Sequence, residues 1–148
     1  MSRIDEALSM LSECKEKSVR ITSPETVVPH LVPWMKKRQE HFIVLLLDGA
    51  HQVIGKPVTV TKGLVNRTMV HPREVFRPAI THNAVAVIVA HNHPSGVNEP
   101  SPEDLDITRL LIKAGNVMGI KVLDHFIVSK TGYISIRKNT GIDFDSED

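Results

Sequence analysis

The chain has 148 residues, of which 41% are hydrophobic and 24% are charged, and its formal net charge is +1. This length supports a single domain with a core that needs no disulfides, and the composition is that of a soluble globular protein. The near-neutral charge provides no large basic field, so binding to DNA is not favoured. The single cysteine, Cys14, cannot form an internal disulfide, and no apolar run is long enough to span a membrane. The charged N-terminal segment does not resemble a signal peptide, so we expect a cytoplasmic protein that does not contact a membrane.

Apolar residues at helical spacing predict an amphipathic helix over residues 3–16. We expect this helix to pack on the core or on a second copy of the chain, which would form a homodimer. Ser23 and Pro24 then favour a second helix, with the serine as N-cap and the proline in the first turn. Because Pro29 and Pro33 fall inside this second helix, it is either kinked or divided into two short pieces.

The rest of the chain alternates between apolar strands and amphipathic helices. Strands are predicted over residues 41–47, 51–61, 84–90, 121–128 and 133–136, and helices over residues 72–81 and 102–118. The nearly continuous apolar runs of the first and third strands indicate burial on both faces. This order indicates an α/β fold with a single mixed β-sheet flanked by helices. The acidic tail, residues 143–148, is expected to fray.

The most informative segment joins the third strand to the long helix and contains two histidines. His91 and His93 lie two residues apart on extended backbone, which Pro94 favours, so their side chains point to the same side. Asp104 follows in the first turn of the helix. Two imidazoles and a carboxylate leave a fourth zinc position for water, which is the pattern of a catalytic site.

A purely structural interpretation of the same segment is also available. Ser101 is a good N-cap for the helix, and Asp104 is a favourable acid in its first turn. The other six histidines are expected to be hydrogen-bonded or surface groups rather than ligands. Among them, His71 and His125 are the candidates for hydrogen bonding to the ligands.

A water molecule activated by zinc needs a general base, and the strand directions leave two candidates. If the first two strands form a hairpin and the helix from Pro72 is a crossover connection, the strand before His91 runs antiparallel to the first strand. Glu40, which precedes the first strand, then lies at the same end of the sheet as His91. Glu74, in the first turn of the crossover helix, also lies near that end. The strand directions alone do not choose between Glu40 and Glu74.

The sequence resembles the JAMM/MPN-type metalloprotease signature, which consists of an upstream glutamate, His-x-His-Pro and Ser-x-x-Asp. Within that superfamily it is most similar to the RadC family, and the similarity extends over residues 22–142. The matching segments are Glu40-His41-Phe42, His71-Pro72-Arg73-Glu74-Val75-Phe76, His91-Asn92-His93-Pro94-Ser95-Gly96, Pro100-Ser101, Asp124-His125 and Ser135. The resemblance divides the chain into an extension (residues 1–21), one RadC-like domain (22–142) and the acidic tail (143–148).

The resemblance implies the JAMM/MPN (cytidine-deaminase-like) architecture and one zinc ion per chain, bound by His91, His93 and Asp104. It selects Glu40 as the base and assigns Ser101 as a hydrogen-bond donor to the oxyanion. The implied reaction is hydrolysis of an amide bond in an unknown protein or peptide, as in a metallopeptidase or isopeptidase. In that reaction Glu40 takes a proton from water and returns it to the leaving amine.

Two other functions compete with this one. The first is a binding module that keeps the fold without turnover, which the complete set of predicted site residues disfavours. The second is a metal-dependent nuclease or another role in DNA metabolism and repair, which the near-neutral charge disfavours. RadC-type proteins often carry a DNA-associated helix-hairpin-helix module, and the two dozen residues before the core show no such hairpin.

Overall fold

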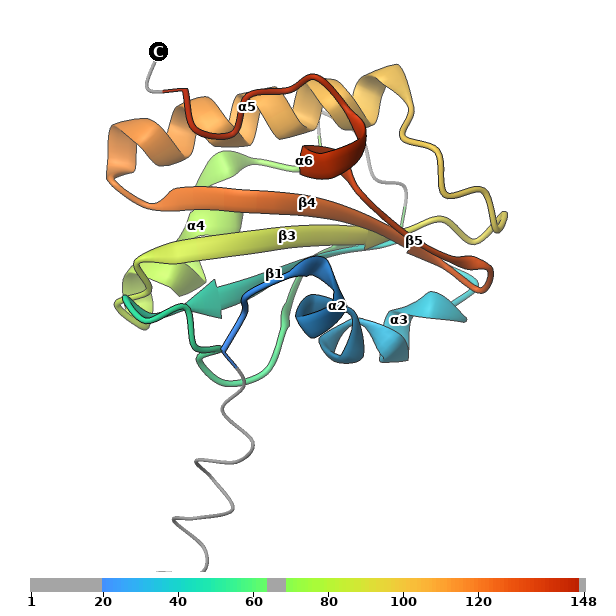
Figure 1. Ribbon diagram of the computed structural model, residues 1–148, viewed down its shortest axis with the longest axis horizontal. Coiled ribbons are helices and arrows are strands. Elements are labelled where there is room, and N and C mark those ends of the chain that lie inside the picture. Colours follow the sequence, from blue (N-terminus) through green and yellow to red (C-terminus); the bar gives the residue numbers. More distant parts are fainter. Residues whose placement is uncertain (1–19, 64–68, 147–148) are drawn as a thin grey trace, which may run out of the picture.

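The computed structural model describes residues 20–63 and 69–146, which form one five-stranded mixed sheet with helices on both faces (Figure 1). The sheet has the order β2-β1-β3-β4-β5. Its strands are β1 (His41–Leu47), β2 (Val58–Lys62), β3 (Ala86–Asn92), β4 (Lys121–Ser129) and β5 (Gly132–Ser135). The predicted fold class is therefore confirmed. The helix predicted over residues 3–16, together with Cys14, lies outside the described residues.

The strand directions decide which side chains meet at each end of the sheet. β1 is antiparallel to both β2 and β3, β3 is parallel to β4, and β4 is antiparallel to β5. Phe42, the second residue of β1, consequently lies opposite His91 near the end of β3. The predicted antiparallel relation is confirmed, and the residue before β1, Glu40, lies at the end of the sheet where β3 finishes.

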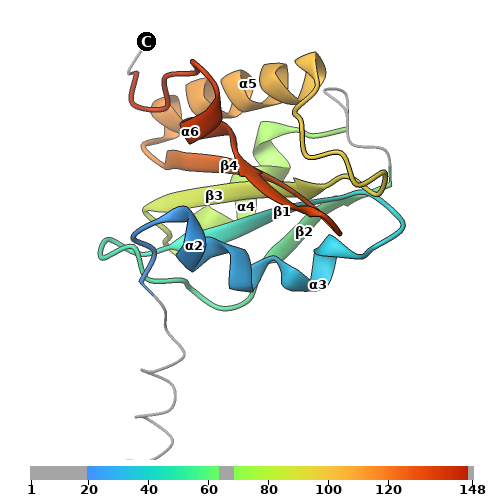
Figure 2. The same cartoon turned by 45° about the vertical axis from the view of Figure 1, so that its right-hand side comes forward.

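Helices cover the sheet on both faces (Figures 1 and 2). They are α2 (Pro24–Val27), the 3-10 helix η1 (Val28–His30), α3 (Val32–Met35), α4 (Pro72–Thr81), α5 (Pro102–Met118) and α6 (Ile136–Asn139). The long helices α4 and α5 lie on one face, and the short helices from α2 to α3 lie on the other. In the described ranges, no helix combines the length and the apolar character that a membrane crossing requires.

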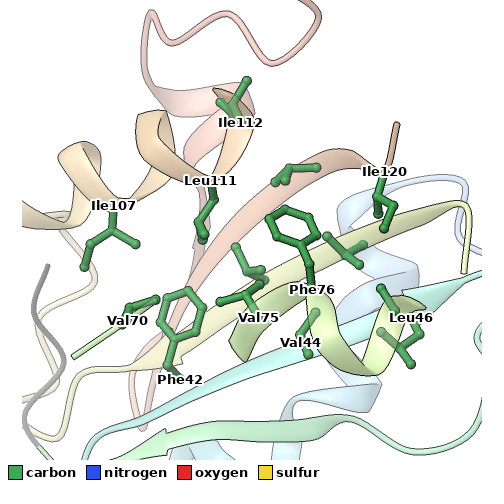
Figure 3. Packing of buried hydrophobic residues seen from close by; sticks show 14 of the residues in the cluster. Phe42, Val44, Leu46, Val70, Val75, Phe76, Ile107, Leu111, Ile112 and Ile120 are labelled. Atoms are coloured by element: carbon green, nitrogen blue, oxygen red, sulfur yellow. The ribbon is translucent and has the colours of Figure 1, made fainter. Parts of the chain in front are cut away.

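The central strands β1 and β3 are buried along their whole length because each face of the sheet has its own core. Phe42, Val44 and Leu46 point toward α4 and α5, where Phe76 and Leu111 pack against them (Figure 3). The alternate residues of β1 point to the other face and pack with residues of α2 and α3. All seven residues of β1 and all seven of β3 are buried, as the continuous apolar runs predicted.

Local backbone features explain where the elements depart from the expected boundaries. The second helix is divided at its prolines, which is one of the two predicted alternatives. The second strand, predicted over residues 51–61, is confined to Val58–Lys62, because His51 (φ 59°) and Gly55 (φ 67°) interrupt the extended backbone. The last strand ends at Ser135, whose hydroxyl accepts a hydrogen bond from the Lys138 amide and so starts the unpredicted helix α6.

The expectation that the acidic tail frays is wrong for residues 143–146. This segment passes beside α5 (Figure 1), and Phe144 is buried in the core with the Arg137 guanidinium 5.7 Å from its ring centroid. Asp145 forms ion pairs with Lys121 at 2.6 Å and with Arg137 at 2.5 Å. One buried aromatic residue and two ion pairs therefore hold the described part of the tail in place.

Candidate metal centre

The three predicted ligands meet at the end of β3 and the beginning of α5. The Nε2 atoms of His91 and His93 are 2.9 Å apart. The carboxylate of Asp104 places Oδ1 3.1 Å from the His91 Nε2 and Oδ2 3.2 Å from the His93 Nε2. One ligand atom from each residue lies within 4.8 Å of the other two, so these groups could hold one metal ion.

Both imidazoles present the same nitrogen to this point. The Nδ1 of His93 hydrogen-bonds to the carbonyl oxygen of Val97 at 2.8 Å, and the Nδ1 of His91 lies 2.9 Å from the Nε2 of His125. A carbonyl oxygen only accepts, so the His93 Nδ1 carries a proton and its Nε2 is left for a metal. Two imidazole nitrogens and a carboxylate are a ligand set found at catalytic zinc sites, and the residues present therefore fit a zinc ion.

The electrostatics of the site favour a cation between the ligands. Burial opposes the ionisation of Asp104, but the hydrogen bonds to His91 and His93 outweigh it and hold the pKa of Asp104 well below its usual range. The hydrogen bond to Asp104 raises the pKa of His93, against the opposing effect of burial. The charge of Glu40 adds to this increase in the pKa of His93. Negative charge thus surrounds the point where the two Nε2 atoms meet.

A capping box fixes the position of the Asp104 carboxylate. The Ser101 Oγ accepts a 3.1 Å hydrogen bond from the Asp104 amide, and the Ser101 amide donates a 2.8 Å hydrogen bond to the Asp104 Oδ2. The structural interpretation of these two residues is therefore correct, and it is compatible with the ligand geometry. Because the Ser101 Oγ acts as an acceptor in the cap, its own proton remains available for donation, and the side chain is exposed.

The loop between His93 and α5 is held by the turn between β4 and β5. The hydroxyl of Thr131 donates a 2.7 Å hydrogen bond to the carbonyl oxygen of Gly96, which has a φ of 87°. The Asn98 side chain also hydrogen-bonds to Thr131. Glycine is required at position 96 by this left-handed backbone, and the turn contacts explain how a long loop can present His93 in a fixed place.

The two candidate bases have different surroundings. Glu40 is half-buried and its charge acts on His93, while its backbone carbonyl accepts a 2.8 Å hydrogen bond from Gly63. The carboxylate of Glu74 instead forms ion pairs with Arg73 at 3.6 Å and Arg77 at 3.8 Å. The charge of Glu40 therefore reaches the His93 imidazole, whereas Glu74 is paired with arginines on α4.

Asn92, between the two histidines, is a site residue that the sequence reasoning missed. Its buried carboxamide accepts a 2.7 Å hydrogen bond from the His41 amide and donates a 3.0 Å hydrogen bond to the Gln39 carbonyl. Asn92 thus holds the backbone on both sides of Glu40. The alternation of side chains along a strand could have indicated this role, because a polar residue between two ligands on one face must point to the opposite face.

One of the two expected histidine partners contacts a ligand. His125 is fully buried on β4, and its two nitrogens contact the His91 Nδ1 and the Thr108 hydroxyl, at 2.9 Å and 2.7 Å respectively. Burial holds the pKa of His125 well below its ordinary value, and the nearby His91 acts in the same direction. His71 is instead the exposed N-cap residue of α4. Thr108 on α5 is a second site residue that the sequence analysis did not single out.

The fold and the site together define a JAB-type domain, in which a mixed sheet presents two histidines beside a helix that carries an aspartate. The family model described as "RadC-like JAB domain" matches residues 21–142. The chain belongs to the RadC-like JAB domain family, as the sequence resemblance implied.

Relatives of the chain carry names that describe no activity. A UPF0758 protein of Geobacter sulfurreducens is 45% identical over 138 residues, which cover 89% of this chain and 60% of the relative. A UPF0758 protein of Methanospirillum hungatei is 46% identical over 125 residues, or 83% of this chain and 55% of the relative. One from Trichlorobacter lovleyi is 49% identical over 117 residues, or 78% of this chain and 50% of the relative. The chain thus spans only about half to three fifths of the length of these relatives.

Proposed function

We propose that this chain is a zinc-dependent metallohydrolase that cleaves an amide bond in a protein or peptide, as a metallopeptidase or isopeptidase. The observation that carries the proposal is the convergence of the His91 and His93 Nε2 atoms with the Asp104 carboxylate. Membership of the JAB family supports the same class of chemistry. The single cysteine supports a reducing compartment, so we place the reaction in the cytoplasm.

The residues around the ligands have the chemical properties that amide hydrolysis needs. A zinc ion held by His91, His93 and Asp104 would supply Lewis acidity and lower the pKa of a bound water molecule. Glu40 would accept a proton from the attacking water and pass it to the leaving amine. The Ser101 hydroxyl, whose proton is not used by the helix cap, would donate to the carbonyl oxygen as negative charge develops on it.

Metal analysis tests the first half of the proposal. We expect the wild-type chain to bind one zinc ion, and His91→Ala to lose that zinc while remaining folded. His82→Ala is a matched control, because the His82 imidazole is exposed and hydrogen-bonds to the carbonyl of Pro78 on α4. Zinc content is measured by atomic emission spectroscopy after dialysis. Equal zinc content in the wild type and in His91→Ala would contradict the assignment of the metal centre.

Substrate capture tests the second half. Glu40→Gln keeps the three ligands and is expected to retain substrates that the wild type releases as products. Candidates captured by this variant are then incubated with the wild-type chain, and new amines are located by mass spectrometry. We expect Glu40→Gln to hydrolyse them about 10²–10⁴ times more slowly, whereas Glu74→Gln keeps the wild-type rate. Equal rates for Glu40→Gln and the wild type would refute the role of Glu40.

A further inference from the structure

Behind the metal centre, four buried residues form a continuous chain of hydrogen bonds. The Nδ1 of His91 lies 2.9 Å from the Nε2 of His125, and the Nδ1 of His125 lies 2.7 Å from the Thr108 Oγ1. The Thr108 hydroxyl in turn donates a 2.9 Å hydrogen bond to the carbonyl oxygen of Asp104. His125 and Thr108 have no exposed surface, and His91 and Asp104 have relative exposures of 1% and 5%. This series of hydrogen bonds therefore begins at one predicted ligand, His91, and ends at the backbone of another, Asp104.

The acceptor at the end of this series of hydrogen bonds determines which atom donates the proton in each of them. A carbonyl oxygen cannot donate, so the single hydroxyl proton of Thr108 is used on Asp104. The Thr108 Oγ1 must then accept from His125, which places a proton on the His125 Nδ1. The two nitrogens of His125 contact an imidazole and a hydroxyl, and a fully buried imidazolium without a carboxylate in contact is costly, so its Nε2 is an acceptor. His91 consequently donates from its Nδ1.

We infer that Thr108 and His125 are positioning residues that fix the tautomer of His91, so that its Nε2 lone pair is directed at the metal centre. Without an oriented acceptor behind it, an imidazole can carry its proton on either nitrogen, and one of those two forms blocks the ligand atom. The inference rests on the metal-binding part of the proposed function and does not depend on amide hydrolysis.

The chain of hydrogen bonds also joins the elements that carry the ligands. His91 lies on β3, His125 on the neighbouring strand β4, and Thr108 lies one helical turn after Asp104 on α5. The Thr108 side chain thus connects the sheet to the first turn of the helix that provides the third ligand. This connection explains why a polar side chain interrupts the otherwise apolar inner face of α5, where Ile107 and Leu111 pack into the core (Figure 3).

Zinc affinity measured on two variants of Thr108 provides the first test. Thr108→Val has nearly the same shape and lacks the hydroxyl, whereas Thr108→Ser keeps the hydroxyl and loses a methyl group. We expect Thr108→Val to weaken zinc binding by about 10–100-fold in competition with a chromogenic chelator, and Thr108→Ser to bind like the wild type. Ile112→Val, on the same helix, is the control for a loss of core packing and should leave the affinity unchanged. Wild-type affinity in a folded Thr108→Val would overturn the inference.

Nuclear magnetic resonance of ¹⁵N-labelled histidine in the wild-type chain gives a second test, which needs no variant to fold. We expect the His125 signals to show a proton on Nδ1 and none on Nε2, with a proton on the His91 Nδ1, both before and after zinc is added. A proton on the His125 Nε2 would overturn the inference. If the wild type binds no zinc, the proposed function fails, yet the tautomer of His125 still decides the direction of the hydrogen-bond chain.

Discussion

The carboxamide oxygen of Asn92 accepts a 2.7 Å hydrogen bond from the backbone amide of His41, and this contact joins the end of β3 to the beginning of β1. The amide nitrogen of Asn92 reaches the Gln39 carbonyl on the other side of Glu40. Because His91 and His93 flank Asn92, the same short segment presents two candidate metal ligands on one face and holds the segment around Glu40, the proposed base, on the other. One buried side chain thus fixes the backbone on both sides of Glu40 relative to the two histidines.

Asn92→Ala should therefore reduce stability and displace Glu40 while leaving the metal ligands in place. Removing a buried, fully hydrogen-bonded side chain is expected to lower the free energy of unfolding by about 1–3 kcal/mol. The measurement is urea denaturation, together with zinc affinity for the folded variant. A loss of zinc as large as that caused by His91→Ala would show that Asn92 supports the ligands rather than the segment around Glu40.

Substitutions at Ser101 should separate its two roles. Ser101→Ala removes the helix cap and is expected to lower the free energy of unfolding by about 1 kcal/mol, whereas Ser101→Gly should change it by only a few tenths. Both variants lack the hydroxyl, so both should lower kcat by about 10²–10³ if Ser101 stabilises the oxyanion. Ser101→Thr keeps both functions and serves as the control. Wild-type turnover by Ser101→Gly would leave Ser101 with the capping role alone.

Gly115 allows α5 to approach the backbone that leads into β4. A Cβ atom on Gly115 would lie 2.3 Å from the carbonyl oxygen of Ile120 and 3.3 Å from the Phe76 ring. Gly115→Ala is therefore expected to lower the free energy of unfolding by about 3 kcal/mol, at the upper end of overpacking costs, because a backbone atom must move. Gly141→Ala, where nothing lies within 4 Å of the added carbon, is the control and should leave stability nearly unchanged. Equal midpoints of thermal denaturation for the two variants would contradict the close approach of α5 to the Ile120 carbonyl.

The stability of the metal-free chain should depend on pH through His125. Burial lowers the pKa of His125 well below 6.5 in the folded chain, whereas the unfolded chain binds the proton near its ordinary value. The unfolded state then holds more protons as the pH falls below that value, so the free energy of unfolding should fall by up to about 1.4 kcal/mol per pH unit. His93 acts in the opposite direction, because its raised pKa contributes stability that is lost as the pH rises.

His125→Gln isolates this contribution. Denaturation of the wild type and the variant, both in the presence of a chelator, should give a difference in stability that shrinks between about pH 7 and about pH 5. A difference that stays constant over this range would mean that His125 binds its proton in the folded chain as readily as in the unfolded one.

The sequence predicted the parts of the molecule that depend on simple periodicity. The strands around His91, the long helix from Pro102 and the convergence of the three ligands follow from alternation, helix capping and the direction of crossover connections. Strand directions place Glu40 and Glu74 at the same end of the sheet and do not choose between them, so Glu40 as the base stays a prediction drawn from the family resemblance.

The parts that could not be predicted depend on single backbone angles or on contacts between distant residues. The left-handed backbone of His51 shortens the second strand, and no pattern of apolar residues reports a single backbone angle. Phe144 looks like an isolated apolar residue in an acidic tail until the core that receives it is formed. Asn92 and Thr108 have partners 51 and 17 residues away along the chain, so their roles follow only from the packed structure.

One oxygen atom, the Oδ2 of Asp104, belongs both to the N-terminal cap of α5 and to the candidate metal centre. It accepts the hydrogen bond of the Ser101 amide that begins α5, and it lies 3.2 Å from the Nε2 of His93. The first helical turn of α5 and the candidate metal centre therefore depend on the same carboxylate position. Opening of that turn would withdraw the carboxylate from the two imidazoles, so a bound metal should slow hydrogen exchange at the Asp104 amide.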